Sequence, residues 1–475
     1  MITLRDYQQS AVDAATYYIH SAEKRPGAII APTAAGKSWI IAAIAKEHKN
    51  PILVLQPSIE LLKQNFEKFE QLGGKASIYS AGAGSKEIGH VTYATLGSIK
   101  KDARKFKEAG VDLIIIDECH MGVKPDKGSM FRNFVDTLAP KKSIGLTATP
   151  FRLKNNMMGS RLVMLNRMRP GYFRHFIHVT QISEMIDRGY WCPSVDEAWI
   201  QDESNLTLNT TGSDFTEASV RAYAEINGIN NKIYVRILDA IKQGRKSILV
   251  FVDSVPTCEK FIEFLSRDYH INCNYLTSDT KKSERNKLIA QFKSGEIQVM
   301  FNYGILGVGF DHPGLDGVIM GRPTNSLAIF YQIYGRGARI LEGKKDFLFA
   351  DYGNNFQRLA HPREIVIENY PGHGWAVFCG EKLVTGVYLS DDMTITKGDL
   401  DAEAEEVMSD LFFKFGKYEG QMVVDIARKY PEYVTWLGCQ PWLDSTFKSK
   451  MLNILKKIQL NNMKGKIEVG KSQFD

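Results

Sequence analysis

Residues 27–48 read GAIIAPTAAGKSWIIAAIAKEH, and this stretch decides the fold of the chain. The run GAIIAP is a short apolar strand, and WIIAAIAKEH has the length and composition of a helix. Between them, residues 31–38 follow the pattern of a phosphate-binding loop, in which backbone N–H groups at a helix N-terminus surround phosphate oxygens. A strand, a loop and a helix in this order predict a parallel sheet covered by helices.

Each polar position of this loop has a predicted role. We expect Lys37 to reach the β and γ oxygens of a nucleotide and the Ser38 hydroxyl to contact Mg²⁺. Thr33, Ala35 and Gly36 complete the loop that holds the phosphates. The loop therefore predicts ATP and Mg²⁺ as cofactors.

An acidic motif, Asp117-Glu118-Cys119-His120, ends the apolar run DLIIIDE. Ligands bind where the carboxyl ends of parallel strands meet, so this motif and the loop are expected at the same edge of the sheet. Asp117 is suited to hold Mg²⁺ through water, and Glu118 to orient or deprotonate an attacking water. Together the two motifs predict a site for nucleotide hydrolysis.

The same alternation of apolar runs and amphipathic stretches occurs twice along the chain. Up to about Thr149 the runs are GAIIAP, PILVLQP, HVTYAT, DLIIIDE and SIGLTAT, and from about Lys246 to Tyr352 they are SILVFV, CNYLTS, IQVMFN, GVIMG and DFLFADY. This pattern predicts an α/β protein with two parallel-sheet lobes. The predicted parts are a first lobe at 1–190, a connecting segment at 191–235, a second lobe at 236–370, an acidic connector at 371–410 and a small accessory module at 411–475.

Composition excludes several classes of protein. The 475 residues suggest about three domains, and 44% hydrophobic and 24% charged residues are typical of globular proteins. Sixty Lys and Arg against 54 Asp and Glu give +6, which permits a polyanionic partner without requiring one. The six cysteines are scattered, and neither a signal peptide nor a membrane span is recognisable, so we expect a cytoplasmic protein without membrane contact.

The motifs in their order resemble those of the superfamily 2 helicases and translocases. DECH resembles their motif II, Thr147-Ala148-Thr149-Pro150 their motif III, and residues 332–339, QIYGRGAR, their motif VI. The resemblance covers about residues 1–355. It implies two tandem RecA-like lobes that hydrolyse ATP and move along a nucleic acid.

The resemblance also assigns roles to individual residues. Leu4-Arg5-Asp6-Tyr7-Gln8 is similar to the adenine-recognising segment, where Gln8, with Arg5, would read the base edge. Arg336 and Arg339 would act as arginine fingers on a γ-phosphate held by the first lobe. Gln332, Gly309 and Asp311 would contact the nucleotide from the second lobe. Coupling between ATP and nucleic acid is assigned to His120, Thr147 and Thr149.

Among the branches of this family, the chain looks most similar to RadD-like and UvsW-like DNA helicases. LRDYQ, DECH, TATPFR, EMIDRGYWCP and RPTNSLAIFYQIYGRGARI carry this similarity. The chain departs from its relatives at residues 304–309, GILGVG, where they have a threonine-rich turn, and this loss of a hydroxyl removes one expected strand contact. The cysteine-rich tail of some RadD-like proteins is also absent.

A basic stretch predicts where a nucleic acid lies. Residues 137–183 contain no Asp or Glu but eight Lys or Arg, with aromatic residues interleaved. Basic side chains neutralise phosphates and aromatic rings stack on bases, although the same pattern also arises from a packed core with a charged outer face. The expected contacts are Arg152, Arg167, Arg169, Tyr172, Phe173 and Arg174. The family resemblance adds phosphate contacts at Pro57, Ser58, Gln64, Thr92 and Thr95.

The last module, from residue 411, resembles a small C-terminal domain of exonuclease X-like proteins. It carries no nuclease carboxylates, and Lys417, Tyr418 and Trp436 are expected either to contact DNA or a protein partner or, for the two aromatic residues, to form its core. The sequence therefore predicts a monomeric DNA helicase or translocase acting on single-stranded, forked, branched or looped DNA. Three alternatives stay open: an RNA helicase, the motor of a restriction or defence complex, and a nucleotide-switched binding protein that does not unwind.

Overall fold

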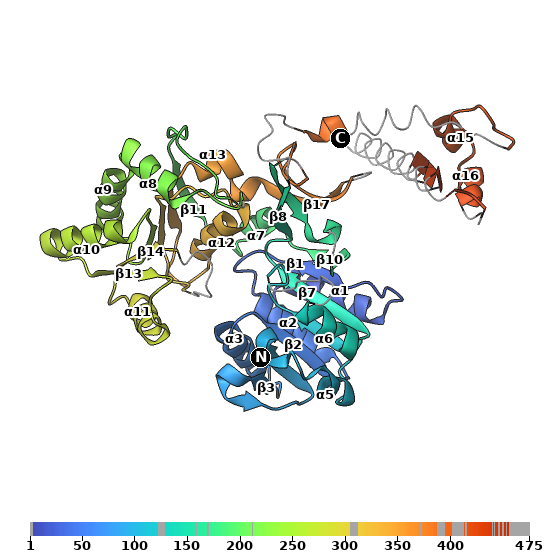
Figure 1. Cartoon of the computed structure of the whole chain (residues 1–475), viewed down its shortest axis with the longest axis horizontal. Helices are drawn as coiled ribbons and strands as arrows, with labels where there is room; N and C mark the ends of the chain where they lie inside the picture. The colour runs from blue at the N-terminus through green and yellow to red at the C-terminus, as the bar shows by residue number, and fades with distance from the viewer. Residues whose placement is uncertain are drawn as a thin grey trace, which may run out of the picture. The chain divides into compact units, whose positions relative to one another are not determined.

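The structure is a computed structural model, shown in Figure 1. It describes residues 3–121, 129–156, 159–168, 171–210, 212–304, 312–370, 373–386, 395–400, 413, 416–438, 440, 442–444, 447–448, 451–452 and 454–455. One compact unit spans Met1–Val366, and a second begins at Ile367. The first unit contains both predicted lobes.

The first lobe is built on an eight-stranded sheet with the order β10-β1-β7-β6-β2-β5-β3-β4. Its strands are β1 (Gly27–Ile30), β2 (Ile52–Gln56), β3 (Ser77–Ser80), β4 (Ser85–Lys86), β5 (Val91–Thr95), β6 (Leu113–Ile116), β7 (Lys142–Thr147) and β10 (His175–Val179). Neighbours run parallel except at the short edge strand β4. β1, β2 and β6 are buried along their whole length, as strands covered on both faces should be. The five strands predicted for this lobe are confirmed.

Helices cover this sheet, and Figure 1 shows α2, α3 and α6 beside its strands. They are α1 (Asp6–His20), α2 (Lys37–Glu47), α3 (Ile59–Gln71), α4 (Leu96–Ile99), α5 (Ala103–Glu108), α6 (Met130–Leu138) and α7 (Ile182–Asp187). Ser58 and Ser129 accept a backbone N–H from the first turns of α3 and α6. Such N-caps satisfy donors that a helix cannot pair internally, so the local sequence fixes where these helices begin.

A two-stranded antiparallel hairpin follows the TATP motif, formed by β8 (Phe151–Asn156) and β9 (Gly159–Met164). Phe151, Leu162 and Met164 are buried on one of its faces. On the other face Lys154 lies directly opposite Arg161. The hairpin is therefore apolar on its inner side and basic on its outer side.

The second lobe has a six-stranded, all-parallel sheet with the order β11-β16-β15-β12-β14-β13. Its strands are β11 (Ser194–Ala198), β12 (Ile248–Phe251), β13 (Cys273–Thr277), β14 (Val299–Tyr303), β15 (Gly317–Met320) and β16 (Phe347–Asp351). Its helices are α8 (Glu217–Ile226), α9 (Ile229–Lys242), α10 (Val255–Tyr269), α11 (Lys282–Ser294), α12 (Leu327–Gly337) and α13 (Asn355–Leu359). The five strands expected for this lobe are confirmed, and Figure 1 shows α8 to α11 beside its sheet.

The predicted connecting segment at 191–235 is wrong for most of its length. β11 pairs with β16 in the sheet of the second lobe, and Tyr223 of α8 belongs to that lobe's core. The sequence SVDEA does not predict this strand, because the strand lies at the edge of the sheet and is only half-buried or exposed. An edge strand needs no continuous apolar run.

The second unit contains a three-stranded sheet with the order β17-β18-β19 (Ile365–Tyr370, Gly374–Cys379 and Lys382–Leu383). The first part of the predicted acidic connector therefore forms a sheet, with Phe378 and Leu383 in a small core. Further along, α15 (Val423–Lys429) and α16 (Pro431–Gly438) enclose a separate core that includes Tyr418. Trp436, in contrast, is 55% exposed, so only one of the two aromatic residues singled out in this module is a core residue.

Within the described residues, no helix combines the length and the apolar character needed to cross a bilayer. The two parallel sheets with their covering helices confirm the predicted α/β class. The carboxyl ends of β1, β6 and β7 lie at one edge of the first sheet, and they carry the phosphate-binding loop, DECH and TATP. The fold thus places the three motifs of the first lobe next to one another.

Candidate functional site

The phosphate-binding loop joins β1 to α2 and has the backbone geometry that an anion requires. Gly36 precedes the helix in the left-handed conformation, with φ of 73°, and Ala34 also has a positive φ, 67°. The second value is unusual for a residue with a side chain, and such strain is concentrated at functional sites. The first N–H groups of α2 have no partner within the helix, so they and the helix dipole offer a site for negative charge.

Two residues of α1 hold this loop from behind. The Tyr7 hydroxyl and the Gln8 amide each donate a hydrogen bond of 2.9 Å to the Ala35 carbonyl. A Cβ atom on Gly36 would lie 2.5 Å from Gln8 Nε2, so a glycine is required for this packing. The other end of the Gln8 amide accepts from the Arg5 backbone N–H, and the Arg5 guanidinium lies 5.0 Å from the Tyr190 ring centroid. Adenine recognition by Arg5 and Gln8 stays a prediction.

The acid pair lies directly against the loop. Lys37 Nζ is 3.4 Å from Glu118 Oε1, and Glu118 itself has a positive φ of 44°. Asp117 is buried and accepts a hydrogen bond of 2.8 Å from the Asn65 amide of α3. The predicted neighbourhood of Lys37, Asp117 and Glu118 is therefore present in the structure.

The electrostatics of the two acids differ. Burial raises the pKa of Asp117, and the adjacent Glu118 carboxylate adds to that rise. Burial also acts against the charged form of Glu118, but the Lys37 ammonium and the His120 ring outweigh it and lower its pKa. Glu118 is thus held in the ionised form, which is the form that can accept a proton from water.

His120 connects this pair to the TATP motif. Its Nδ1 is 2.7 Å from Thr147 Oγ1 and 3.3 Å from Glu118 Oε2. Thr147 in turn accepts from the Thr149 backbone N–H at 3.0 Å, and both threonines are fully buried. The three residues predicted to couple ATP to nucleic acid are therefore linked by hydrogen bonds, and an ion-pair contact joins His120 to Glu118.

The donor set fits a magnesium ion. Ser38, at the start of α2, and Asp117 supply the hydroxyl and carboxylate oxygens that Mg²⁺ prefers, and the nucleotide phosphates and water would complete its shell. Among the described residues no group of three or more His, Cys, Asp or Glu side chains is arranged to hold a metal.

The second lobe reaches the same loop through α12. A Cβ atom on Gly335 would lie 2.6 Å from Thr33 Cβ, so the helix contacts the phosphate-binding loop at the residue before Arg336. Gln332 lies one turn earlier on this helix, and Arg339 lies just after its end. Gly309 and Asp311 lie outside the described residues.

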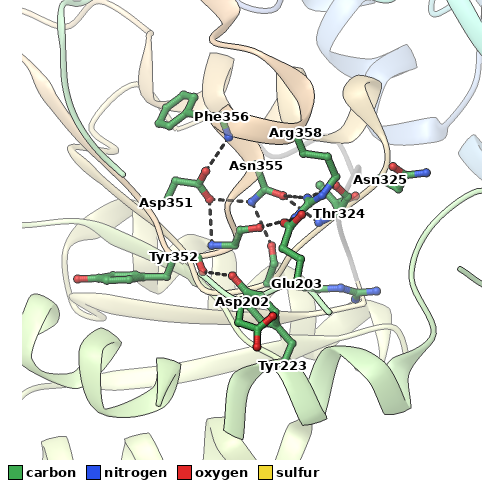
Figure 2. Close-up of polar contacts among 12 residues, drawn as sticks. Asp202, Glu203, Tyr223, Thr324, Asn325, Asp351, Tyr352, Asn355, Phe356 and Arg358 are labelled. Atoms are coloured by element: carbon green, nitrogen blue, oxygen red, sulfur yellow. Dashed lines mark hydrogen bonds and ion pairs between the residues drawn. The ribbon is translucent and has the colours of Figure 1, made fainter. Parts of the chain in front are cut away.

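A polar network fixes the start of α12 (Figure 2). Asp351, at the end of β16, accepts hydrogen bonds from the Asn355 amide at 2.8 Å and from the backbone of Gly353 and Phe356. Asn355 Oδ1 accepts from the Thr324 N–H at 2.9 Å, and Arg358 donates to the Thr324 carbonyl at 2.8 Å. Both backbone groups of Thr324 are thereby held just before the helix that carries the arginines.

The predicted phosphate contacts of the first lobe have mixed outcomes. Ser58 lies at the N-terminus of α3, where its hydroxyl accepts from the Leu61 N–H at 3.2 Å. Pro57 directly precedes it, and Gln64 lies further along the same helix. Thr95 lies just before α4, and its hydroxyl is hydrogen-bonded to those of Ser80 and Ser98. A contact from Thr92 is wrong, because this side chain is fully buried and its hydroxyl bonds the backbone of Gly89.

The aromatic part of the basic stretch is also wrong as a stacking surface. Tyr172 and Phe173 are buried, and the Tyr172 hydroxyl is 2.7 Å from Ser143 Oγ inside the first lobe. Arg152 and Arg167 are partly buried, and burial lowers the pKa of both. Arg174 donates to the Met168 carbonyl at 3.1 Å, and Arg169 lies outside the described residues.

Three residues that contact the site have no role predicted from the sequence. Asn65 contacts Asp117, Tyr7 contacts the loop, and the indole N–H of Trp191 donates to the Thr33 carbonyl at 3.1 Å. Each contact joins residues far apart in the chain, and none belongs to a short motif. Tyr7 and Trp191 do lie inside segments that carry the family resemblance, LRDYQ and EMIDRGYWCP, but the resemblance gives neither residue a contact.

Two family models match consecutive parts of this chain. The model "Type III restriction enzyme, res subunit" matches residues 1–152, and "Helicase conserved C-terminal domain" matches residues 231–341. The first range contains the phosphate-binding loop and DECH, and the second contains α12. In the order of its two matched domains the chain thus resembles the superfamily 2 helicases, a class of ATP-hydrolysing enzymes.

Particular relatives agree with that class. The chain is 29% identical to a candidate ATP-dependent helicase, IRC3, of Saccharomyces cerevisiae, covering 74% of this chain and 51% of that protein. It is 24% identical to the DNA 3'-5' translocase XPB2 of Sulfurisphaera tokodaii, over 73% of this chain and 80% of the relative. A fragment of a candidate HsdR subunit of a type I restriction enzyme from Vibrio vulnificus has the same fold (TM-score 0.56, 24% identity, 76% of this chain and 66% of that one). The chain spans about half the length of IRC3.

Proposed function

We propose that the protein is an ATP-dependent DNA helicase or translocase that acts on forked, branched or looped DNA. The observation that carries this proposal is the meeting of both lobes at one loop. Lys37 and Glu118 lie 3.4 Å apart in the first lobe, and Gly335 of α12 packs on Thr33 in the same loop. A nucleotide held there would contact both lobes, and its hydrolysis would change how tightly they are held together.

Each residue of the site has a part in this mechanism. Lys37 and the N–H groups of the loop bind the phosphates, and Glu118 accepts a proton from the attacking water. Arg336 and Arg339 supply positive charge to the transition state from the second lobe. Bound Mg²⁺ would neutralise phosphate charge. Because the arginines and the loop belong to different lobes, hydrolysis requires closure.

The protein would move along DNA if the two lobes bound the strand differently before and after ATP hydrolysis. The contacts from Glu118 through His120 to Thr147 and Thr149 would transmit the state of the nucleotide along the carboxyl edge of the first sheet, where Ser58 and Thr95 also lie. Hydroxyls and helix N-termini bind phosphate without reading bases. We therefore propose a preference for DNA structure and little preference for sequence.

The finer placement in the family is part of the same proposal. LRDYQ, DECH and TATPFR support a place beside RadD-like and UvsW-like DNA helicases, and a relative named as a DNA translocase supports DNA over RNA. The C-terminal module, compared above with exonuclease X-like proteins, is proposed as an accessory contact for DNA or a protein partner. We propose a monomer as the active form.

The substrate is tested by ATP turnover on matched nucleic acids. Single strand, duplex, fork and four-way junction of DNA, and RNA of the same sequence, are compared at two salt concentrations. We expect the fork or junction to stimulate most and the stimulation to fall steeply with salt, because phosphate contacts dominate binding. Equal or stronger stimulation by RNA would contradict the proposed substrate, and strand-displacement measurements distinguish a helicase from a protein that hydrolyses ATP without unwinding.

A second candidate is the motor of a restriction complex. It is favoured by the match to the res subunit of type III restriction enzymes over residues 1–152 and by the fold shared with a candidate HsdR subunit. Such a motor needs a nuclease partner, since the sequence has no recognisable nuclease motif. Co-purification of the full chain from its host with a nuclease or methyltransferase subunit would favour this candidate.

A further inference from the structure

Two adjacent residues between the lobes each form a hydrogen bond to one of the two lobes at the proposed nucleotide site. The indole N–H of Trp191 donates a hydrogen bond of 3.1 Å to the carbonyl of Thr33, in the phosphate-binding loop of the first lobe. The backbone N–H of Cys192 donates one of 2.8 Å to the carbonyl of Ala338, at the C-terminal end of α12 in the second lobe. Consecutive residues thus join the loop to the helix of the arginines.

The surroundings hold Trp191 in this position. Its side chain is 2% exposed, and its ring lies 6.2 Å from that of Tyr334, on α12. The Tyr334 hydroxyl is 2.7 Å from Ser194 Oγ and donates to Asp196, which also bonds His361 at 2.9 Å. Because Ser194 and Asp196 belong to β11, the sheet of the second lobe fixes the ring against which Trp191 packs.

The bond to Thr33 acts on the geometry of the loop. A trans peptide is planar, so its C=O and the following N–H point in opposite directions. Holding the Thr33 carbonyl toward Trp191 therefore directs the Ala34 N–H away from Trp191. Ala34 has a positive φ of 67°, a conformation that needs support from its neighbours. Trp191 supplies such support from outside the first lobe's motifs.

The bond to Ala338 acts on the arginines. Ala338 lies between Arg336 and Arg339 and ends α12. Near its last turns, this helix contacts the loop only because residue 335 is a glycine, since a Cβ there would lie 2.6 Å from Thr33 Cβ. Small displacements of the helix end would therefore change the distance between the arginines and a bound phosphate.

We propose that Trp191 is a positioning residue for ATP hydrolysis. It fixes the position of α12 and its arginines relative to the phosphate-binding loop. This inference rests on the proposed ATPase function. Trp191 does not touch the reacting atoms; it sets where Arg336 and Arg339 lie when the lobes close. It also gives the segment EMIDRGYWCP a role beyond linking two domains.

The test compares Trp191→Phe, which keeps an aromatic ring but loses the N–H, with the wild-type chain. We expect kcat for ATP to fall about two- to tenfold, the effect of one neutral hydrogen bond. The affinity for a fluorescent ADP analogue should change less than kcat, because the lost contact acts through the arginines in the transition state. Trp199→Phe is the matched control, since Trp199 is 39% exposed and stacks on Tyr352 in the second lobe.

A double-mutant cycle separates positioning from general damage. If Trp191 acts through α12, Trp191→Phe should have little further effect on the residual turnover of an Arg339→Ala variant. Full additivity, or a wild-type kcat in Trp191→Phe, would overturn the inference. The inference would also be overturned if the fall in kcat in Trp191→Phe came with a matching loss of thermal stability that Trp199→Phe does not show. If the wild-type chain hydrolyses no ATP, the proposed function itself fails, and the two failures are distinct.

Discussion

The side-chain amide of Asn65 donates a hydrogen bond of 2.8 Å to the carboxylate of Asp117, and both residues are buried. Asn65 lies on α3, beside β2, and Asp117 lies at the end of β6. The bond fixes the orientation of the carboxylate assigned to Mg²⁺. Residues that hydrogen-bond to a metal-binding side chain affect metal affinity, as the metal ligands themselves do.

Replacing Asn65 should therefore weaken Mg²⁺ binding. In Asn65→Leu we expect the Mg²⁺ concentration needed for half-maximal binding of a fluorescent ADP analogue to rise about tenfold. Binding without Mg²⁺, in EDTA, should change little, and this comparison is the internal control. An unchanged Mg²⁺ requirement would show that Asn65 serves packing alone.

The contact between the lobes should depend on the absence of a side chain at residue 335. In Gly335→Ala the added methyl group would lie 2.6 Å from Thr33 Cβ, so α12 must move away from the loop. We expect kcat for ATP to fall more than tenfold. Alanine is a better helix former than glycine by about 1 kcal/mol, which offsets part of the cost of the clash, and the thermal midpoint of the variant shows whether the fold is retained.

Gly97→Ala is the matched control for that variant. Gly97 is also helical, in α4, but nothing lies within 4 Å of a Cβ built there. This variant should hydrolyse ATP at the wild-type rate. If Gly335→Ala behaves in the same way, α12 does not depend on its approach to Thr33.

The network before α12 should contribute strongly to the stability of the second lobe. In Asn355→Ala the buried Asp351 carboxylate loses the hydrogen bond from the Asn355 amide, and the Thr324 N–H loses its acceptor, Asn355 Oδ1 (Figure 2). We expect a loss of about 2–4 kcal/mol in the free energy of unfolding, measured by urea denaturation. Asn205→Ala, at an exposed site with a single 3.4 Å contact to Ser204, should change it by less than about 0.5 kcal/mol.

The outer face of the β8–β9 hairpin is expected to contact DNA phosphates. Lys154 is exposed and lies directly opposite Arg161, so this face of the hairpin carries two neighbouring positive charges that can neutralise phosphates. Lys154→Ala should weaken DNA binding and reduce the slope of log affinity against log salt by about 0.7–0.9. Lys75→Ala is the control, because Lys75 is exposed before β3 at the amino end of the strands. An unchanged slope in Lys154→Ala would exclude a phosphate contact.

The parts of this protein that a sequence can predict are those with a local cause. GAIIAP and DLIIIDE are buried on both faces, so their apolar runs mark them as central strands. The loop at residues 31–38 and the acids Asp117 and Glu118 follow strands directly, so the sheet itself brings them together.

What the sequence did not predict depends on contacts between distant residues. Trp191 and Thr33 are 158 residues apart in the chain, and no spacing links them. Tyr172 and Phe173 stand among arginines, yet their rings turn into the core, because the order of residues does not show which of them face inward. The edge strand β11 is only half-buried or exposed, so its sequence predicts a connection instead of a strand.

One measurement tests the shared nucleotide site most directly: the DNA-stimulated kcat for ATP of Arg339→Ala, compared with the wild-type chain at equal thermal stability. We expect kcat to fall about a thousandfold or more, the usual effect of removing an arginine finger, while the variant still binds a fluorescent ADP analogue. A soluble, folded Arg339→Ala protein with wild-type turnover would contradict a site completed by both lobes.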